Sequence, residues 1–248
     1  MRVAAIYDIH GNLPALEAVL RDIGKAEVDL VVVGGDVVPG PMPRETLMRV
    51  LDLDIPVRFI RGNGDRVVAS QMEGIEPAEV PEQFRDVIRY SAQELSSEHG
   101  NILASWPETV RVQVSGVGEV LFCHATPRSD TEVFTRLTPE HSALPAFEGV
   151  STPMAVCGHT HMQFDRMIGD VRVVNAGSVG MPFGIPGAYW LLLDHGVELQ
   201  QTTYDFANAA ERIRQTNYPR AHEFAERNIL QPPSEKQMLE VFTKVELK

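Results

Sequence analysis

The stretch Val3-Ala4-Ala5-Ile6-Tyr7-Asp8-Ile9-His10 decides the fold, because an apolar run ends there in an aspartate and a histidine. Residues 3–7 predict a buried strand, and Asp8 and His10 would lie at its carboxyl end, where side chains of neighbouring strands converge. The same pattern occurs four more times: residues 30–33 before Gly34-Gly35-Asp36, 57–60 before Arg61-Gly62-Asn63-Gly64-Asp65, 120–122 before Cys123-His124, and 154–156 before Cys157-Gly158-His159-Thr160-His161. Five such units predict one sheet edge lined with metal ligands.

The ligand types suit a site for two divalent cations. A shared carboxylate can hold two cations close together while imidazole and amide groups fill the other positions, and Asp36 is the natural bridge. Glycines beside the ligands, such as Gly35 and Gly62, let a strand turn at once and let backbone approach an ion. Each fragment alone is a weak signal, since His159 and His161 could be two surface histidines. All five in this order predict a dinuclear site.

The motif order D-x-H, G-D, G-N, H and G-H-x-H resembles the calcineurin-like metallophosphoesterase superfamily, over Asp8 to His161. Two further segments, Asp8-Ile9-His10-Gly11-Asn12-Leu13 and Asn175-Ala176-Gly177-Ser178-Val179-Gly180, resemble its small bacterial and archaeal phosphodiesterase branch. With them the resemblance reaches about Leu193.

The resemblance implies a ligand set and a mechanism. Asp8, His10 and His161 would hold one metal, Asn63, His124 and His159 the other, and Asp36 would bridge them. Imidazole, carboxylate and amide ligands accept manganese, iron, zinc, cobalt or nickel, of which manganese is favoured. A hydroxide bridging the metals would attack phosphorus in line with the leaving group, with Asp8, Asp36, Asn63, Asp65 and His124 as the catalytic set.

One position departs from the family pattern. Phosphomonoesterase members usually have a histidine directly after the asparagine, where it can protonate the leaving oxygen, and this chain has Gly64 there. Without that acid the site should favour better leaving groups, which points to a phosphodiesterase. His99, His141 and His195 are interpreted as surface residues, since nothing in their spacing brings them to the site.

Several other residues are candidates for supporting roles. Asp65 is expected to orient a ligand, with His124 as the first choice. Asn12 could cap a helix or contact substrate, and Asn175 could orient a ligand or simply belong to a loop. Arg66 and Arg128 are the arginines best placed in sequence to reach a phosphate, although solvated surface arginines are more common. Cys123 and Cys157 are expected to pack as small buried hydrophobic residues.

Composition limits the class of partner. The chain has 248 residues, is 44% hydrophobic and carries a formal net charge of −12. This acidity argues against stable binding of duplex nucleic acid and favours a small phosphoester or nucleotide substrate. Two cysteines, the lack of an apparent leader and the lack of a membrane-length apolar run predict a cytoplasmic protein, and a homo-oligomer remains possible.

The element pattern predicts an α/β fold. Helical spacing at residues 13–23 and 42–51, between apolar strands, predicts parallel pairing in the first part of the chain. Turns at 116–118, 168–170 and 194–196 predict hairpins of a second, largely antiparallel sheet. Helical residues 81–97 could cap the site or form an outer layer, and layer is preferred. The resemblance implies a four-layer αββα sandwich of two mixed β-sheets flanked by helices.

The chain is interpreted as a single domain, 1–248. Its core would cover about residues 1–204, and C-terminal helices at about 205–248 would cover an open sheet face, with a dimer contact or lid as the alternative. The expected activity is hydrolysis of phosphodiester or phosphoanhydride bonds in small nucleotide-like substrates. A protein or nucleotide phosphomonoesterase is the nearer alternative, and a metal-bound interaction scaffold without catalysis is the more distant one.

Overall fold

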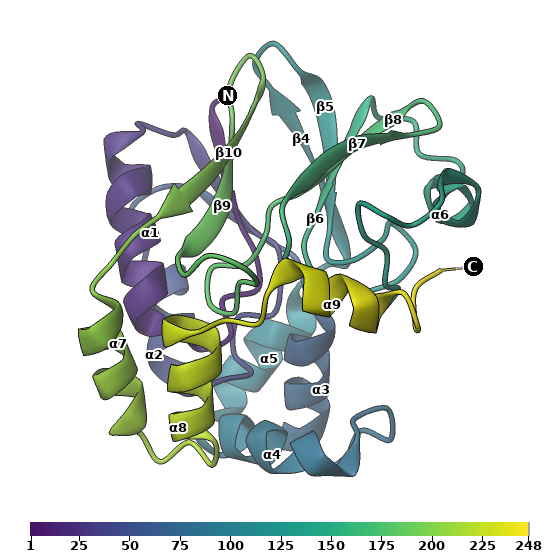
Figure 1. The fold of residues 1–248 in the computed structure, drawn as a ribbon. Coiled ribbons are helices and arrows are strands. Elements are labelled where there is room, and N and C mark those ends of the chain that lie inside the picture. The colour runs from purple at the N-terminus through teal and green to yellow at the C-terminus, as the bar shows by residue number, and fades with distance from the viewer. Residues whose placement is uncertain (248) are drawn as a thin grey trace.

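Two mixed sheets form the centre of the computed structural model, which describes residues 1–247 (Figure 1). The first sheet has the order β10-β9-β1-β2-β3, built from β1 (Val3–Ile6), β2 (Leu30–Val33), β3 (Val57–Phe59), β9 (Ala188–Leu193) and β10 (Val197–Thr202). The second has the order β4-β5-β6-β8-β7, built from β4 (Thr109–Val114), β5 (Gly118–Cys123), β6 (Met154–Cys157), β7 (Phe164–Ile168) and β8 (Val171–Asn175). The prediction of an α/β fold with two mixed sheets is confirmed.

Alternation along β1 explains why the first sheet is buried on both faces. Val3 and Ala5 belong to an apolar cluster between the two sheets, together with Val120 and Phe122 of β5. Ala4 and Ile6 belong instead to a cluster beneath the helices. Because side chains in a strand alternate between faces, one short apolar strand can serve both clusters.

Helices cover the outer face of each sheet and complete the four layers. On the first sheet lie α1 (Leu13–Lys25), α2 (Pro43–Leu51), α3 (Asn63–Met72), α4 (Arg85–Gln93) and α5 (Ser97–Ser105), whose apolar residues join the helix-side cluster. On the second sheet, α6 (Glu140–Phe147) packs Ala143 and Phe147 against Leu121 and Ala155. The core is therefore layered as helix, sheet, sheet, helix, as the family resemblance implied.

Two predictions about the second sheet are wrong. It is not largely antiparallel, because β5 pairs in parallel with β6 and β6 in parallel with β8. The hairpin at 194–196 joins β9 to β10 in the first sheet, where β9 pairs antiparallel with β1. A tight turn identifies two paired strands but does not say which sheet they join, since that depends on pairing over a long sequence separation.

The C-terminal segment forms α7 (Phe206–Arg214), α8 (Ala221–Phe224), a π-helix (Ala225–Leu230) and α9 (Glu235–Phe242). Apolar residues of α7, α8 and the π-helix pack mainly on one another, with Tyr204 and Met181, so they form a small separate core instead of the expected cover over a sheet face. Figure 1 shows α9 (yellow) lying across the middle of the molecule. No helix in the described part of the chain is long and apolar enough to cross a membrane.

Candidate metal centre

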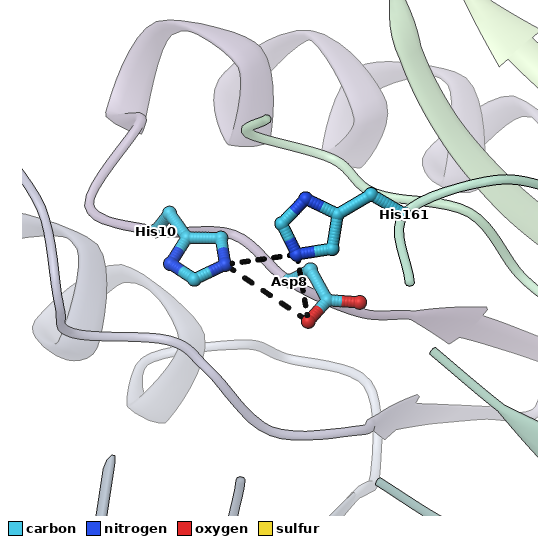
Figure 2. A group of neighbouring side chains, drawn as sticks. All are labelled: Asp8, His10 and His161. Atoms are coloured by element: carbon cyan, nitrogen blue, oxygen red, sulfur yellow. Dashed lines mark hydrogen bonds and ion pairs between the residues drawn. The ribbon is translucent and has the colours of Figure 1, made fainter. Parts of the chain in front are cut away.

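The seven candidate ligands converge at the carboxyl ends of five strands. Asp8 and His10 follow β1, Asp36 follows β2, Asn63 begins α3 after β3, His124 follows β5, and His159 and His161 follow β6. Figure 2 shows Asp8, His10 and His161 pointing toward one another. Parallel strands place their carboxyl ends at one edge of a sheet, and the two sheets pack face to face, so ligands from both meet there. The prediction of a single sheet edge lined with ligands is therefore corrected to two adjacent sheets.

Asp8 and Asp36 lie at the centre of the histidines. Asp8 Oδ1 lies 3.5 Å from His161 Nε2, 4.0 Å from His10 Nε2 and 3.9 Å from His124 Nε2. Asp36 directs Oδ2 to within 3.7 Å of His10 Nε2 and Oδ1 to within 3.6 Å of His124 Nε2. One carboxylate thus reaches both histidine groups through different oxygens, which is the geometry that a bridging ligand requires.

The unsatisfied polar atoms of the site fit divalent cations. Asp8 Oδ1 is buried and receives no hydrogen bond, which is costly for a carboxylate without a cation. The amide of Asn63 presents one edge to His124 Nε2 and His159 Nδ1, each 3.1 Å away. When the side-chain oxygen of Asn63 lies on that edge, this oxygen and the two imidazole nitrogens all present lone pairs to one another. A bound cation would satisfy all three.

Backbone carbonyls orient three of the imidazoles. Nδ1 of His10 lies 3.2 Å from Pro39 O, that of His124 lies 2.9 Å from Gly34 O, and that of His161 lies 2.8 Å from Met181 O. Each Nδ1 can donate its hydrogen there, which leaves Nε2 free for a cation. The expectation that Asp65 orients His124 is therefore wrong, since Gly34 O takes that position.

Asp65 instead fixes the loops that carry two ligands. It is buried, and Oδ1 accepts hydrogen bonds from the backbone N–H groups of Val37 and Val38 at 2.8 and 3.2 Å. Oδ2 accepts from Gly62 N at 3.2 Å. Burial and the charge of Asp36 raise the pKa of Asp65 to about 7, against the effect of these three donors. Asp65 thus ties the segment after Asp36 to the start of α3 at Asn63.

The charges divide the histidines into two kinds. Burial opposes a charge on His124 and on His161, but the carboxylates of Asp36 and Asp8 outweigh it and raise the pKa of both imidazoles. Burial, with His124 next to it, lowers the pKa of His159 to about 4, so this imidazole is neutral at physiological pH. Burial favours protonated Asp8, but His161, His124 and His10 hold its pKa well below the usual range.

Five of the candidate ligands have left-handed backbone conformations, which non-glycine residues rarely adopt. The φ angles are 53° at Asp8, 49° at His10, 53° at Asp36, 65° at His159 and 58° at His161. Such conformations store strain and cluster at functional sites. The sequence does not show this feature, because the residue types at these positions are those that the chemistry demands.

Asn12 and Asn175 have supporting positions. Asn12 is buried, its Oδ1 accepts from Ala15 N at 3.2 Å and its Nδ2 donates to Gly180 O at 2.9 Å, so the capping alternative describes its contacts. Asn175 Nδ2 donates to Gly158 O at 2.6 Å and to Thr160 Oγ1 at 3.2 Å. It braces the loop that carries His159 and His161, which is the orienting role considered for it.

The two candidate arginines differ in position. Arg66 lines a cleft beside the ligands. Its Nε donates to Asp130 Oδ2 at 2.7 Å, and its Nη1 donates to Glu79 Oε1 at 2.7 Å. Arg128 binds Glu132 and Pro145 O and is not among the residues that line this cleft. The structure therefore brings Arg66 to the site and leaves Arg128 away from it, while substrate contact by either arginine stays a prediction.

The remaining sulfur and imidazole groups have structural positions. Cys123 and Cys157 are buried free thiols in the cluster beneath α6, which confirms their expected packing role. Burial raises the pKa of Cys123 to about 12. His141 and His195 are exposed, and His99 accepts a hydrogen bond from Ser96 N in the N-terminal cap of α5.

The cleft beside the ligands was not apparent from the sequence. It has a volume of about 560 Å³ and reaches from His10, Asp36 and Asn63 to the segment of residues 79–88. Pro81, Phe84 and Ile88 of that segment belong to the stretch 81–97, for which an outer layer was preferred, and the structure makes them part of the cleft lining, nearer to the capping alternative.

The fold and the convergent donors define a metal-dependent phosphoester hydrolase, and comparison with known proteins gives the family. Residues 1–195 match the calcineurin-like phosphoesterase superfamily domain. The phosphodiesterase YfcE of Escherichia coli K12 is 26% identical over 206 residues, which cover 79% of this chain and 89% of that protein. The chain therefore belongs to the calcineurin-like phosphoesterase superfamily.

Two solved structures share the overall architecture. A metallophosphoesterase from Sphaerobacter thermophilus is 25% identical, with a TM-score of 0.73 over 92% of this chain and 97% of its own. The hypothetical protein PH1004 from Pyrococcus horikoshii OT3 has a TM-score of 0.79 at 22% identity, over 94% of this chain and 99% of its own. The second likeness concerns the fold alone.

Proposed function

We propose that this phosphoesterase uses two divalent cations to hydrolyse phosphodiester or phosphoanhydride bonds in small nucleotide-like substrates. Asp8, His10 and His161 would hold one cation, and Asn63, His124 and His159 the other. Asp36 would bridge them through its two oxygens. The observation that carries the proposal is the buried Asp8 Oδ1, which has three imidazole nitrogens around it and no hydrogen-bond donor.

The chain's own residues act in this reaction by position. When bound, two cations acidify water and neutralise phosphoryl oxygens. Asp8 and Asp36 supply the negative charge that draws the cations in, and carbonyls of Pro39, Gly34 and Met181 keep the imidazoles aimed at them. With water as the nucleophile, no side chain needs to form a covalent intermediate with the substrate.

Gly64 supports a diester substrate over a monoester. A Cβ on Gly64 would lie 2.5 Å from Pro39 Cγ and 2.8 Å from Asp36 Oδ1. A histidine at this position, as the phosphomonoesterase pattern requires, would therefore have to displace Pro39 or the bridging carboxylate. Without an acid to protonate a poor alkoxide, the site suits leaving groups that depart as stable anions.

A comparison of model esters tests the proposal. The protein is stripped with a chelator, reconstituted with manganese, and assayed on bis(p-nitrophenyl) phosphate beside p-nitrophenyl phosphate. Metal-dependent turnover of the diester above that of the monoester is expected. A monoester preference would favour the phosphatase alternative, and no turnover of either ester would favour the scaffold.

The proposed bridging role of Asp36 leads to a separate prediction. Asp36→Ala should abolish binding of the metal pair and reduce diester hydrolysis by at least about a hundredfold, because each cation loses a ligand. Cys157→Ala is the control, since this buried thiol belongs to the apolar cluster beneath α6 and is not a candidate ligand. Metal content and turnover are measured for both, and full turnover by Asp36→Ala would contradict the bridging role.

A further inference from the structure

The lining of the cleft beside the candidate ligands combines two kinds of residue. It includes His10, Asp36, Asn63 and Gly64. It also includes the apolar side chains of Pro39, Val67, Val80, Pro81, Phe84 and Ile88. A substrate whose phosphate meets the candidate ligands can therefore contact apolar side chains with its ester group.

Among the residues that the structure describes, the charged groups of the cleft offer no unpaired arginine to bind a second phosphate. Arg66, the arginine in the lining, donates to Asp130 through Nε and to Glu79 through Nη1, each at 2.7 Å. Nη2 adds a 3.2 Å bond to the other oxygen of Asp130, so the guanidinium already faces two carboxylates. An additional phosphate here would have to break these pairs and approach Glu79 and Asp130. The lining therefore disfavours a polyphosphate chain beyond the reacting phosphorus.

The size and surface of the cleft match a flat ring. Its volume of about 560 Å³ is within the range of small-molecule sites, which are mostly apolar with a few polar groups. Phe84 is 43% exposed, and Val80 is half-buried. The guanidinium of Arg220 lies 5.1 Å from the centroid of the Phe84 ring and binds the carbonyl of the preceding Gln83, which holds the ring in place. A fixed, partly exposed aromatic ring is a suitable stacking surface.

Gly64 lies where a candidate ligand meets the apolar lining. Its backbone N–H donates to Asp36 Oδ1 at 2.6 Å, and a Cβ here would lie 2.5 Å from Pro39 Cγ. The absence of a side chain thus lets Asp36 and Pro39 pack closely against the start of α3.

Resting on the proposed function, we infer that this cleft binds an uncharged aromatic group, such as an aryl ring or a nucleobase, attached to the reacting phosphate. Phe84 and Val80 are then the residues that determine this specificity, through contact with the ring. The substrate class narrows to phosphodiesters with an aromatic substituent, in preference to linear polyphosphates.

The affinities of two phosphonates that are not hydrolysed can be compared to measure the contact between an aromatic ring and the cleft. Phenylphosphonate and methylphosphonate carry the same charged head group, so the ratio of their affinities for the manganese-reconstituted protein reports the contact made by the ring. Calorimetric titration of the wild type should show phenylphosphonate binding about tenfold tighter. Phe84→Ala and Val80→Ser should lose most of this ratio and leave the methylphosphonate affinity unchanged.

Leu199→Ala is the matched control, because Leu199 on β10 is 44% exposed and is not among the residues of the cleft. It should keep the wild-type ratio. Equal affinities for the two phosphonates in a protein that hydrolyses diesters, or an unchanged ratio in both cleft variants, would overturn the inference alone. Failure to bind either phosphonate, together with no metal-dependent hydrolysis, would overturn the proposed function and this inference with it.

Discussion

The two sheets bring different chemistry to the same edge. The first sheet supplies Asp8, His10, Asp36 and Asn63, and the second supplies His124, His159 and His161. Both carboxylates among these candidate ligands thus come from one sheet, while the other brings imidazoles alone. Apolar packing of β1 on β5 holds the two sheets face to face. The attraction for cations resides mainly in one sheet, and the enclosure of the site depends on both.

Removal of a carboxylate from the first sheet should have a larger effect on the site than removal of an imidazole from the second. Asp8→Asn should lower diester turnover by at least about a hundredfold and reduce bound metal, because a buried anion beside three imidazoles is lost. His159→Ala, which removes a neutral ligand from the second sheet, should have a smaller effect on metal content. Steady-state kinetics and elemental analysis measure both, with the exposed Asp54→Asn as control. Equal losses from the two ligand variants would contradict the division of roles.

Metal removal tests whether cations join the sheets. Ligands from both sheets surround the site, so metal binding should stabilise the folded chain by about 4 kcal/mol at a thousandfold excess over Kd. That corresponds to a rise in Tm of roughly 10 °C for a chain of this size, measured by thermal unfolding with and without chelator. Asp36→Ala should show little metal-dependent shift. A full shift in that variant would mean that the stabilising metal binds elsewhere.

The pH dependence of metal binding should arise mainly from the second sheet. The pKa of His124 and that of His161 are raised in the metal-free protein, so these imidazoles keep their protons to higher pH and cations must displace them. Apparent affinity should therefore rise with pH, by up to about tenfold per pH unit for each imidazole, and level off once both are neutral. His159, with a pKa of about 4, should add nothing above about pH 5. Equilibrium dialysis from acid to neutral pH measures this, and a flat profile would contradict it.

The aromatic packing against His161 should influence metal binding less than the ligands themselves do. The ring of His161 stacks on that of Phe183, with the ring centroids 5.4 Å apart. Phe183 in turn packs against Phe242 of α9, and the centroids of these two rings are 6.1 Å apart. Phe242→Ala should loosen this support and weaken binding of one metal by a few-fold, up to about tenfold. Val241→Ala, on the same helix and 48% exposed, is the control. Calorimetric titration with manganese measures both, and equal affinities would show that α9 does not influence the site.

The sequence predicted the candidate site more fully than its surroundings. Strand patterns that end in Asp8, Asp36 and His124 are local, and parallel strands bring their ends together, so the convergence could be expected. The partner of His124 Nδ1 could not, because Gly34 O is a backbone atom and leaves no trace in residue type. Left-handed φ angles at the ligands are hidden for the same reason.

Strand pairing over long sequence separations limited how much of the fold could be predicted from the sequence. The hairpin of β9 and β10 was expected from its turn, but its place beside β1 depends on contacts with residues nearly two hundred positions earlier. The part of the cleft lining at Pro81, Phe84 and Ile88 was predicted only as helical spacing within 81–97, since nothing local indicates that Phe84 lines a cleft. The candidate ligand motifs could be identified from the sequence of this chain, whereas the surfaces around them depended on tertiary packing.

The position of α9 has a consequence for the order of events during synthesis. Among the candidate ligands, Asp8 is made first and His161 last. Phe242, which contacts Phe183 beside His161, is made about eighty residues after His161. Because a chain is released from its amino terminus onward, it cannot finish the packing around the candidate metal centre until Phe242 has also left the ribosome, well after the last candidate ligand.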